Sequence, residues 1–259
     1  MNVLDRFRLD GRRVLITGGS RGLGREMALA LADVGAGIVM TGRDRASLED
    51  AAAAIRARGR EAIPIAADMN DPAACERACH EALATGPIHI LINNVGDRRV
   101  SIPIEETSLE TWRQMMDLNL TTCFICTKVI GGAMIGRGAG GRIINISSMS
   151  ALIANRGIGG RHYETAKAAM LHFTRCTAAD WAPHGITVNA ICPGLFMTEP
   201  NRQWAESRPE VIKTITDATP LGRCGEPEEL GPLAVYLASD ASAFATGAAF
   251  VIDGGYTLW

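Results

Sequence analysis

The chain has 259 residues, of which 47% are hydrophobic and 21% charged, with a formal net charge of −2 and a pI near 6.2. This composition indicates a globular chain with a large core and excludes a disordered one. The near-balanced charge provides no electrostatic basis for nucleic-acid binding, and no uninterrupted apolar run approaches the ~18 residues of a membrane span.

Strand and helix patterns alternate along the chain. The expected strands cover residues 14–16, 37–41, 62–66, 88–92, 142–146, 186–191 and 248–252. The expected helices cover about 25–32, 46–58, 72–84, 108–135, 162–181 and 226–237. This order predicts an α/β fold, in which a mainly parallel sheet of about seven strands carries helices on both faces. Pro64 should place its strand at a sheet edge, because proline lacks the N–H that a central strand donates.

One segment interrupts this alternation. Residues 195–224 contain two short helical patterns bounded by Pro200, Pro209 and Pro220, and we expect them to form an insertion above the strand ends. No repeat, low-complexity tract or linker divides the chain, so we expect a single domain over residues 1–259.

The seven cysteines lie at positions 75, 79, 123, 126, 176, 192 and 224, without the compact spacing of a disulfide framework. This usage predicts reduced thiols in a cytoplasmic protein, and the first ten residues lack the apolar core of a signal peptide. Cys123 and Cys126 have the C-x-x-C spacing of a redox motif. They fall inside a predicted helix, so we expect them to pack in the core or at an interface, and we expect no metal site.

The first strand runs into a glycine-rich loop and then a helix, in the stretch VLITGGSRGLGR of residues 14–25. Backbone N–H groups at the start of such a helix bind phosphate, and glycines let the phosphate approach closely. The spacing is T-G-x-x-x-G-x-G and not the more general G-x-G-x-x-G. Taken alone, the loop indicates either a dinucleotide site or an ordinary turn of an α/β domain.

Three polar segments follow later strands and should meet at the carboxyl edge of the sheet, where ligands of such folds bind. They are Ser147-Ser148, the segment from Tyr163 to Lys167, and Pro193-Gly194. The i, i+4 spacing puts the phenol and the ammonium on one helix face. A nearby ammonium favours the phenolate, which suits Tyr163 to general acid–base catalysis, and a serine hydroxyl can hold a carbonyl oxygen. A solvated helix face is the alternative for the Tyr–Lys pair.

In combination, these residues resemble the short-chain dehydrogenase/reductase family over nearly the whole chain. Thr17-Gly18, Gly22 and Gly24 are similar to its cofactor loop, and the segment from Asn93 to Gly96 is similar to its Asn-Asn-Ala-Gly motif. Asp68, Asp253-Gly254-Gly255 and the segment Pro193-Gly194 with Thr198 also have counterparts in the family. The resemblance implies a single doubly wound Rossmann-type domain, commonly assembled as a homotetramer. It implies a catalytic tetrad of Asn119, Ser148, Tyr163 and Lys167.

The resemblance also implies roles for the tetrad. Tyr163 is then the proton donor in reduction, Ser148 orients the substrate carbonyl, and Lys167 binds the nicotinamide ribose and lowers the pKa of the tyrosine. Asn119 is implied to hold a water in a proton relay towards Lys167. Ser148 precedes Tyr163 by 15 residues where the family usually has about two fewer, so Ser150 is the alternative serine.

The end of the second strand bears on the choice of cofactor. An acid there would bind the 2′-hydroxyl of NAD, whereas arginine suits the 2′-phosphate of NADP. Gly42 takes the expected acid position, and Arg43 with Arg21 could clamp a phosphate, which favours NADP(H). Asp44 is the alternative, and it would favour NAD(H). The expected cofactor contacts are Gly18, Ser20, Arg21, Gly22, Leu23, Gly24, Arg43, Asp68, Met69, Asn94, Val95, Gly96, Tyr163, Lys167, Pro193, Gly194, Phe196 and Thr198.

The substrate is less clearly indicated. Several cations surround the predicted pocket and would suit a small acidic carbonyl or alcohol compound, such as a keto sugar acid; they are Arg98, Arg99, Arg156, Arg161 and His162. Solvent exposure or subunit salt bridges would explain them equally well. The resemblance extends to gluconate 5-dehydrogenase-type members and to 3-oxoacyl-carrier-protein reductases, and Phe196 with Trp204 could line an apolar pocket instead. A protein that senses dinucleotides without catalysis is the remaining alternative.

Overall fold

The computed structural model describes residues 2–98, 100–155 and 159–258. Its sheet has seven parallel strands in the order β3-β2-β1-β4-β5-β6-β7. The strands are β1 (Arg13–Ile16), β2 (Gly37–Gly42), β3 (Ala62–Ala66), β4 (Ile90–Asn93), β5 (Gly141–Ile146), β6 (Ile186–Pro193) and β7 (Ala249–Ile252). This order, with crossover helices between parallel strands, is that of a doubly wound Rossmann-type fold, as the sequence predicted.

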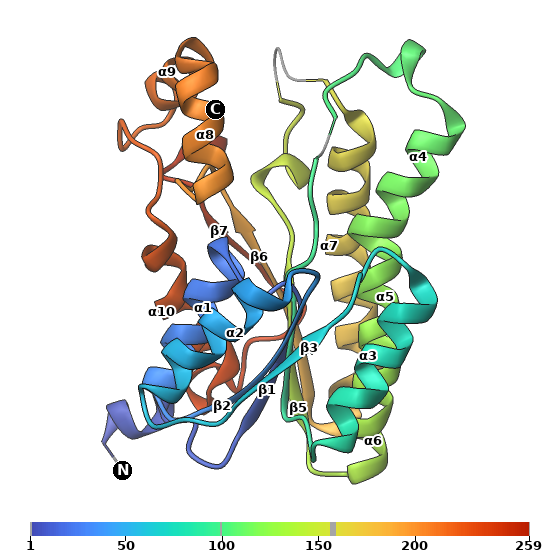
Figure 1. The fold of residues 1–259 in the computed structure, drawn as a ribbon, viewed down its shortest axis with the longest axis vertical. Coiled ribbons are helices and arrows are strands. Elements are labelled where there is room, and N and C mark those ends of the chain that lie inside the picture. The colour runs from blue at the N-terminus through green and yellow to red at the C-terminus, as the bar shows by residue number, and fades with distance from the viewer. Residues whose placement is uncertain (1, 99, 156–158, 259) are drawn as a thin grey trace.

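Helices cover both faces of the sheet (Figure 1). One face carries α1 (Gly22–Asp33), α2 (Arg45–Arg56) and α10 (Gly231–Ala238), and the other carries α3 (Pro72–Ala84), a long helical run over 109–137, and α7 (Arg161–Trp181). Two further helices, α8 (Glu199–Ser207) and α9 (Pro209–Ala218), lie near the carboxyl ends of β6 and β7, within the segment where the sequence predicts two short helices.

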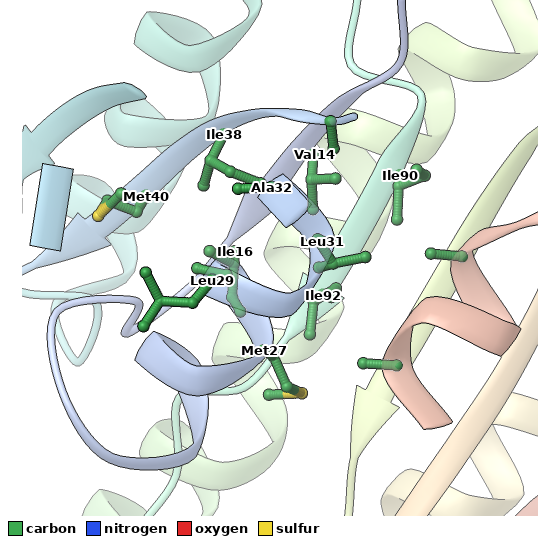
Figure 2. Close-up of a cluster of buried hydrophobic side chains, with 14 of the residues drawn as sticks. Val14, Ile16, Met27, Leu29, Leu31, Ala32, Ile38, Met40, Ile90 and Ile92 are labelled. Carbon is green, nitrogen blue, oxygen red and sulfur yellow. The ribbon is translucent and has the colours of Figure 1, made fainter. Parts of the chain in front are cut away.

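The central strands are apolar throughout because both of their faces are buried. Val14 and Ile16 of β1 pack in the cluster beneath α1, together with Met27 and Leu31 of that helix (Figure 2). Leu15 of the same strand points to the opposite face, into the cluster beneath α3 and α7. The two-residue alternation of the strand therefore supplies both cores at once.

The predicted strands and helices are confirmed, with small shifts at their ends. Pro64 lies on β3, which is an edge strand, as predicted. The first helix begins three residues earlier than predicted, at Gly22, since glycines 22 and 24 are themselves helical. The predicted helix over 226–237 divides into a 3-10 turn (Pro227–Leu230) followed by α10.

The helical run of 29 residues from Leu109 to Arg137 contains α4 (Leu109–Met116), α5 (Thr122–Cys126) and α6 (Gly132–Arg137), joined by two π-helical turns, Asp117–Thr121 and Thr127–Gly131. Its length and composition would allow it to cross a membrane. The sequence did not indicate this, because no uninterrupted apolar run approaches the length of a span. Half of its most apolar window is buried inside the fold, where it contacts α3 and α7. A buried core helix of a globular domain has the same properties.

Candidate active site

The glycine loop after β1 leaves the start of α1 open. Arg21 is the N-cap of α1, yet its side chain makes no capping hydrogen bond, and the first turn contains no acid. The first N–H groups of the helix are therefore available to an anion, which the helix dipole also favours. A Cβ atom on Gly24 would lie 2.2 Å from the carbonyl oxygen of Gly18, so only glycine allows the loop to fold back this tightly.

Thr17 and Asn94 hold this loop against the end of β4. The Thr17 hydroxyl accepts hydrogen bonds from the backbone N–H groups of Asn94 and Val95, at 2.9 and 3.1 Å. The Asn94 amide in turn donates to the carbonyls of Thr17 and Gly18. Val95 replaces the alanine usual in the family, and its Cγ2 lies 3.2 Å from a Cβ built on Gly18. The extra methyl groups thus pack against the loop that Asn94 fastens.

The end of β2 presents arginine and no free carboxylate. Gly42 is buried, and a Cβ atom there would lie 3.0 Å from the Ser20 hydroxyl. Arg43 is exposed, as is Arg21 across the loop. Asp44 accepts hydrogen bonds from the backbone N–H and the hydroxyl of Ser47 and so caps α2. These bonds, with a smaller contribution from Arg21, lower the pKa of Asp44.

The other predicted cofactor contacts differ in how much side chain they expose. Asp68 is exposed after β3, whereas Met69 is buried and its carbonyl accepts a hydrogen bond from Thr122. Gly194, next to Pro193, lies against Asp253, and Thr198 lies against Gly22 of the loop. The Phe196 side chain is 4% exposed and packs on Gly225, so only its backbone could reach a cofactor. The alternative, that Phe196 lines an apolar pocket with Trp204, stays a prediction.

Tyr163 and Ser148 face each other at the carboxyl edge of the sheet. Tyr163 is in the first turn of α7, and Ser148, which is 8% exposed, follows β5. Burial raises the pKa of Tyr163, while a hydrogen bond with the Ser148 side chain and the positive charge of Arg98 act in the opposite direction. A phenol with a hydroxyl partner at a strand end can exchange a proton with an oxygen bound between them.

Lys167 lies one turn beyond Tyr163, and its side chain is nearly fully buried. Its ammonium donates a hydrogen bond of 2.8 Å to the carbonyl of Ile146 and lies 5.7 Å from the centroid of the Tyr163 ring. Burial lowers the pKa of Lys167 to about 8. The lysine is thus desolvated and close to the phenol, and its ammonium has one hydrogen-bond acceptor at the end of β5.

Asn119 completes the cluster from the first π-helical turn of the 109–137 run. Its side chain is fully buried, accepts from the N–H of Asp97 and donates to the carbonyls of Asp97 and Met115. A Cβ atom on Gly96 would lie 2.7 Å from both Asn119 Oδ1 and Lys167 Nζ. A side chain at position 96 would therefore collide with both polar groups, and glycine avoids this.

Ser150, the alternative serine, belongs to a different hydrogen-bond network. Its hydroxyl accepts from Asn155 Nδ2 at 2.8 Å and from Arg98 Nη2 at 3.3 Å. Ser148 Oγ instead accepts from the backbone N–H of Ser150 and pairs with Tyr163. Of the two serines, Ser148 is the one that these contacts bring to the phenol.

The predicted cluster of cations is only partly present. His162 is 1% exposed, and burial lowers its pKa, which disfavours its charged form. Arg161 is paired with Glu164 at 2.6 Å. Arg98 lies within the site, whereas Arg99 and Arg156 fall outside the described residues.

The two cysteines of the C-x-x-C spacing do not face each other. Cys123 Sγ contacts Asn145 Oδ1, while Cys126 Sγ lies 3.5 Å from Cys75 Sγ, and Cys79 completes a buried group of three thiols. Cys75 and Cys126 are 51 residues apart, and no local spacing in the sequence indicated that they meet.

Comparison with known proteins gives matches over the whole length of the chain. A family model described as enoyl-(acyl carrier protein) reductase matches residues 18–257. Galactitol 2-dehydrogenase (L-tagatose-forming) of Cereibacter sphaeroides is 42% identical, and the match covers 98% of each chain. Gluconate 5-dehydrogenase of Gluconobacter oxydans is 37% identical, again over 98% of each chain. The solved structure of a gluconate 5-dehydrogenase from Burkholderia cenocepacia, in complex with NADP and tartrate, has 37% identity, a TM-score of 0.92 and full coverage of both chains.

Proposed function

The chain belongs to the short-chain dehydrogenase/reductase family, and on this premise we propose that it is an NADP(H)-dependent oxidoreductase interconverting a secondary alcohol and a carbonyl. The observation that carries the proposal is the meeting of Ser148, Tyr163, Lys167 and Asn119 at the carboxyl edge of the sheet. The uncapped start of α1 faces the same edge and fits a dinucleotide phosphate. All four groups of an acid–base catalyst are present, which argues against a non-catalytic sensor.

In the proposed reaction, Tyr163 transfers the proton and Ser148 holds the substrate oxygen. In the oxidation direction the Tyr163 phenolate takes the hydroxyl proton of the alcohol, and in reduction the phenol returns it. The Ser148 hydroxyl donates to the same oxygen as negative charge develops on it. A bound nicotinamide accepts or supplies the hydride, so the residues need only orient the substrate and move the proton.

Lys167 and Asn119 support this proton transfer. The buried ammonium is proposed to hold the nicotinamide ribose and to stabilise the phenolate, while Asn119 positions a water between Lys167 and solvent. Gly96 lies between the two side chains, and its missing Cβ leaves them the space they occupy. With Lys167 at a pKa of about 8, this lysine can itself release and regain a proton near neutral pH.

The preference for NADP(H) rests on the arginines at the end of β2. Arg21 and Arg43 are exposed on either side of the expected ribose position, and guanidinium groups bind phosphate through charge-assisted hydrogen bonds. Asp44, the alternative NAD ligand, already caps α2. The related Burkholderia structure contains NADP, which supports the same choice.

We propose a sugar acid or sugar alcohol as the substrate. The related enzymes are a galactitol 2-dehydrogenase and gluconate 5-dehydrogenases, and tartrate occupies one of the related structures. Arg98 lies beside Tyr163 and Ser150 with 22% of its side chain exposed, so the site carries a positive charge that suits an acidic substrate. A 3-oxoacyl thioester of a carrier protein is the second candidate, since the matching family model is described as a carrier-protein reductase.

We further propose that the chain acts as a single cytoplasmic domain, assembled as a homotetramer. Exposed apolar side chains lie on the 109–137 helical run, on β7 and near the C-terminus, at Leu109, Phe124, Val251 and Leu258. Burial between copies would remove this surface from water. Light scattering coupled to gel filtration tests the assembly, and a mass of one chain would reject it.

The decisive experiment is a fluorescence titration of the purified protein with NADPH and with NADH, followed by turnover assays. We expect tighter binding of NADPH, and NADP-dependent oxidation of gluconate or galactitol. Tighter binding of NADH would move the ribose contact to Asp44. Reduction of a 3-oxoacyl thioester without sugar oxidation would select the second candidate. Absence of binding to either dinucleotide would reject the proposed enzyme.

A further inference from the structure

The Arg98 guanidinium lies over the ring of the catalytic tyrosine. Its guanidinium carbon is 4.7 Å from the centroid of the Tyr163 ring, one ångström closer than the Lys167 ammonium. The arginine comes from the loop after β4, whereas both Tyr163 and Lys167 belong to α7. The Tyr163 ring therefore lies near two cations that come from different parts of the fold.

Hydrogen bonds to backbone and side chain fix the plane of this guanidinium. Nη1 donates to the carbonyl of Gly159 at 2.7 Å and, more weakly, to that of Gly160 at 3.4 Å. Nη2 donates to the Ser150 hydroxyl at 3.3 Å. A guanidinium whose two terminal nitrogens are already hydrogen-bonded loses little conformational entropy when it packs on the ring. This favours a persistent contact with the ring.

Glu164, the residue after Tyr163, also lies beside the Arg98 guanidinium. Its carboxylate is 8% exposed and lies 3.8 Å from Arg98 Nη1 and 2.6 Å from Arg161 Nη1. Asn155 donates to the same carboxylate through both its backbone N–H and its side chain. These contacts keep the Arg98 guanidinium beside the phenol.

The two loops that carry this network are themselves joined. The N–H of Gly159 donates to the Ser101 hydroxyl, and the N–H of Gly160 donates to the carbonyl of Ile102. The loop after β4 therefore cannot move from the start of α7 without breaking several hydrogen bonds. This connection ties the position of Arg98 to that of the tyrosine.

We propose that Arg98 is a positioning residue for the reaction assigned above, and that its guanidinium, anchored by Glu164 and the Gly159 carbonyl, holds the Tyr163 ring and stabilises its phenolate. The proposal rests on the proposed function for its catalytic consequence, but the electrostatic effect exists without turnover. A positive charge against the ring favours the anionic form and adds to the effect of Lys167.

Other charged and titratable groups also face the phenol. Lys167 acts from its own helix, Asp97 from the loop after β4, and Cys192 from β6, and the last two oppose ionisation of the phenol. Burial opposes it as well and is the largest influence, so the pKa of Tyr163 remains above its usual value. Removal of Arg98 should raise that pKa further, because the Ser148 hydroxyl and Lys167 would then oppose these groups without its charge.

Phenolate absorbance in the ultraviolet measures this effect directly, because the chain has only three tyrosines. The protein is titrated with base without substrate, and the transition missing from Tyr163→Phe identifies the catalytic tyrosine. In Arg98→Met we expect this transition to move to higher pH by about one unit. Arg98→Lys keeps the positive charge but loses the planar guanidinium. In this variant we expect the transition to shift to higher pH by a smaller amount.

Arg161→Met is the matched control, since Arg161 also pairs with Glu164 but has no contact with the ring. Its Tyr163 transition should stay close to that of the parent protein. An unchanged transition in both Arg98 variants would overturn the proposal. An equal move in Arg161→Met would also overturn it, because the effect would then belong to the whole network and not to the stacked guanidinium. Circular dichroism of each variant checks the fold.

Kinetics separate this role from simple substrate binding. If the dehydrogenase activity is present, Arg98→Met should lower kcat about tenfold near neutral pH for acidic and neutral polyols alike, and move the ascending limb of the oxidation profile to higher pH. A rise in KM restricted to acidic substrates, with an unmoved profile, would make Arg98 a substrate contact and overturn the positioning role. Absence of any activity would reject the proposed function, while the phenolate titration would still test Arg98.

Discussion

The ammonium of Lys167 donates a hydrogen bond of 2.8 Å to the carbonyl of Ile146, the last residue of β5. A second hydrogen bond runs in the opposite direction, from the hydroxyl of the next residue, Ser147, to the carbonyl of Lys167 at 2.9 Å. The two bonds fasten α7 to the strand that leads to Ser148. The distance between the proposed proton donor and its hydroxyl partner is thereby set by a strand and a helix, and not by loops alone.

Burial of Lys167 makes the stability of the protein depend on pH. Its pKa is about 8 in the folded protein and about 10.4 in an unfolded chain. The unfolded chain therefore binds more protons between these values, and the free energy of unfolding rises with pH in this window. We expect wild type to gain about 2 kcal/mol from this group between about pH 7.5 and about pH 9.5.

Urea unfolding at the two pH values measures this gain. Lys167→Met removes the titrating group, so its free energy of unfolding should rise by correspondingly less over the same window. Lys213→Met is the control, since Lys213 is an exposed lysine on α9 and should leave the gain intact. Equal gains in wild type and Lys167→Met would show that the buried ammonium is not the source.

Tyr163→Phe removes the proposed proton donor and leaves the ring in place. We expect kcat to fall by about 10²- to 10⁴-fold, as for loss of a general acid–base group, with NADPH affinity changed by less than about threefold. Tyr236→Phe is the matched control, because that tyrosine packs with Phe7 and Phe250 away from the site. Turnover of Tyr163→Phe within about tenfold of wild type would remove the tyrosine from the mechanism.

Much of the architecture could be predicted from the sequence because it is encoded locally. Apolar runs such as 90–92 and the alanine-rich helix over 46–58 each indicate one element, and Pro64 indicates a sheet edge without any knowledge of partners. The meeting of Tyr163 with Ser148 followed from one rule, that the strands of a parallel sheet end at the same edge.

The remainder depends on contacts between distant residues. Asn119 was identified by its motif, but nothing in the sequence marked the π-helical turn that carries it. The charge of Arg98 is evident from the sequence, but the direction of its side chain is not. Its contact with Tyr163 depends on two loops separated by more than 50 residues. Asp44 is the alternative ribose ligand by its position after β2, and the structure shows that it also caps α2 through Ser47.

The two candidate serines should differ in their kinetic effect. Ser148→Ala removes the hydroxyl that pairs with Tyr163, and we expect kcat to fall by about 10²-fold or more. Ser150→Ala removes an acceptor of Asn155 and Arg98, and we expect a smaller loss. Steady-state kinetics of the two variants under one set of conditions decides between them. A larger loss in Ser150→Ala would reverse the assignment.

Arg43 should control the choice between the two dinucleotides. Arg43→Asp replaces a phosphate-binding cation by an acid that suits a free 2′-hydroxyl, so the ratio of kcat/KM for NADP over NAD should fall by about 10- to 100-fold. Arg45→Asp is the matched control, since Arg45 is equally exposed but lies two residues further, in the first turn of α2. If the ratio is the same in both variants, the clamp of Arg21 and Arg43 does not select the cofactor.

Gly24 should tolerate no side chain, because its own loop occupies the space. A Cβ atom there would lie 2.2 Å from the Gly18 carbonyl and 2.6 Å from the Asn94 amide nitrogen, and both groups belong to the hydrogen-bonded loop. In Gly24→Ala the start of α1 must move away, so we expect NADPH affinity to fall by about tenfold or more, by loss of backbone contacts to phosphate.

Gly136→Ala provides the opposite case, since nothing lies within 4 Å of its added Cβ. That helical substitution should leave NADPH affinity unchanged and add about 0.5–1 kcal/mol to the free energy of unfolding. Fluorescence titration and urea unfolding measure both quantities, and full NADPH affinity in Gly24→Ala would contradict the role of this loop as the phosphate site.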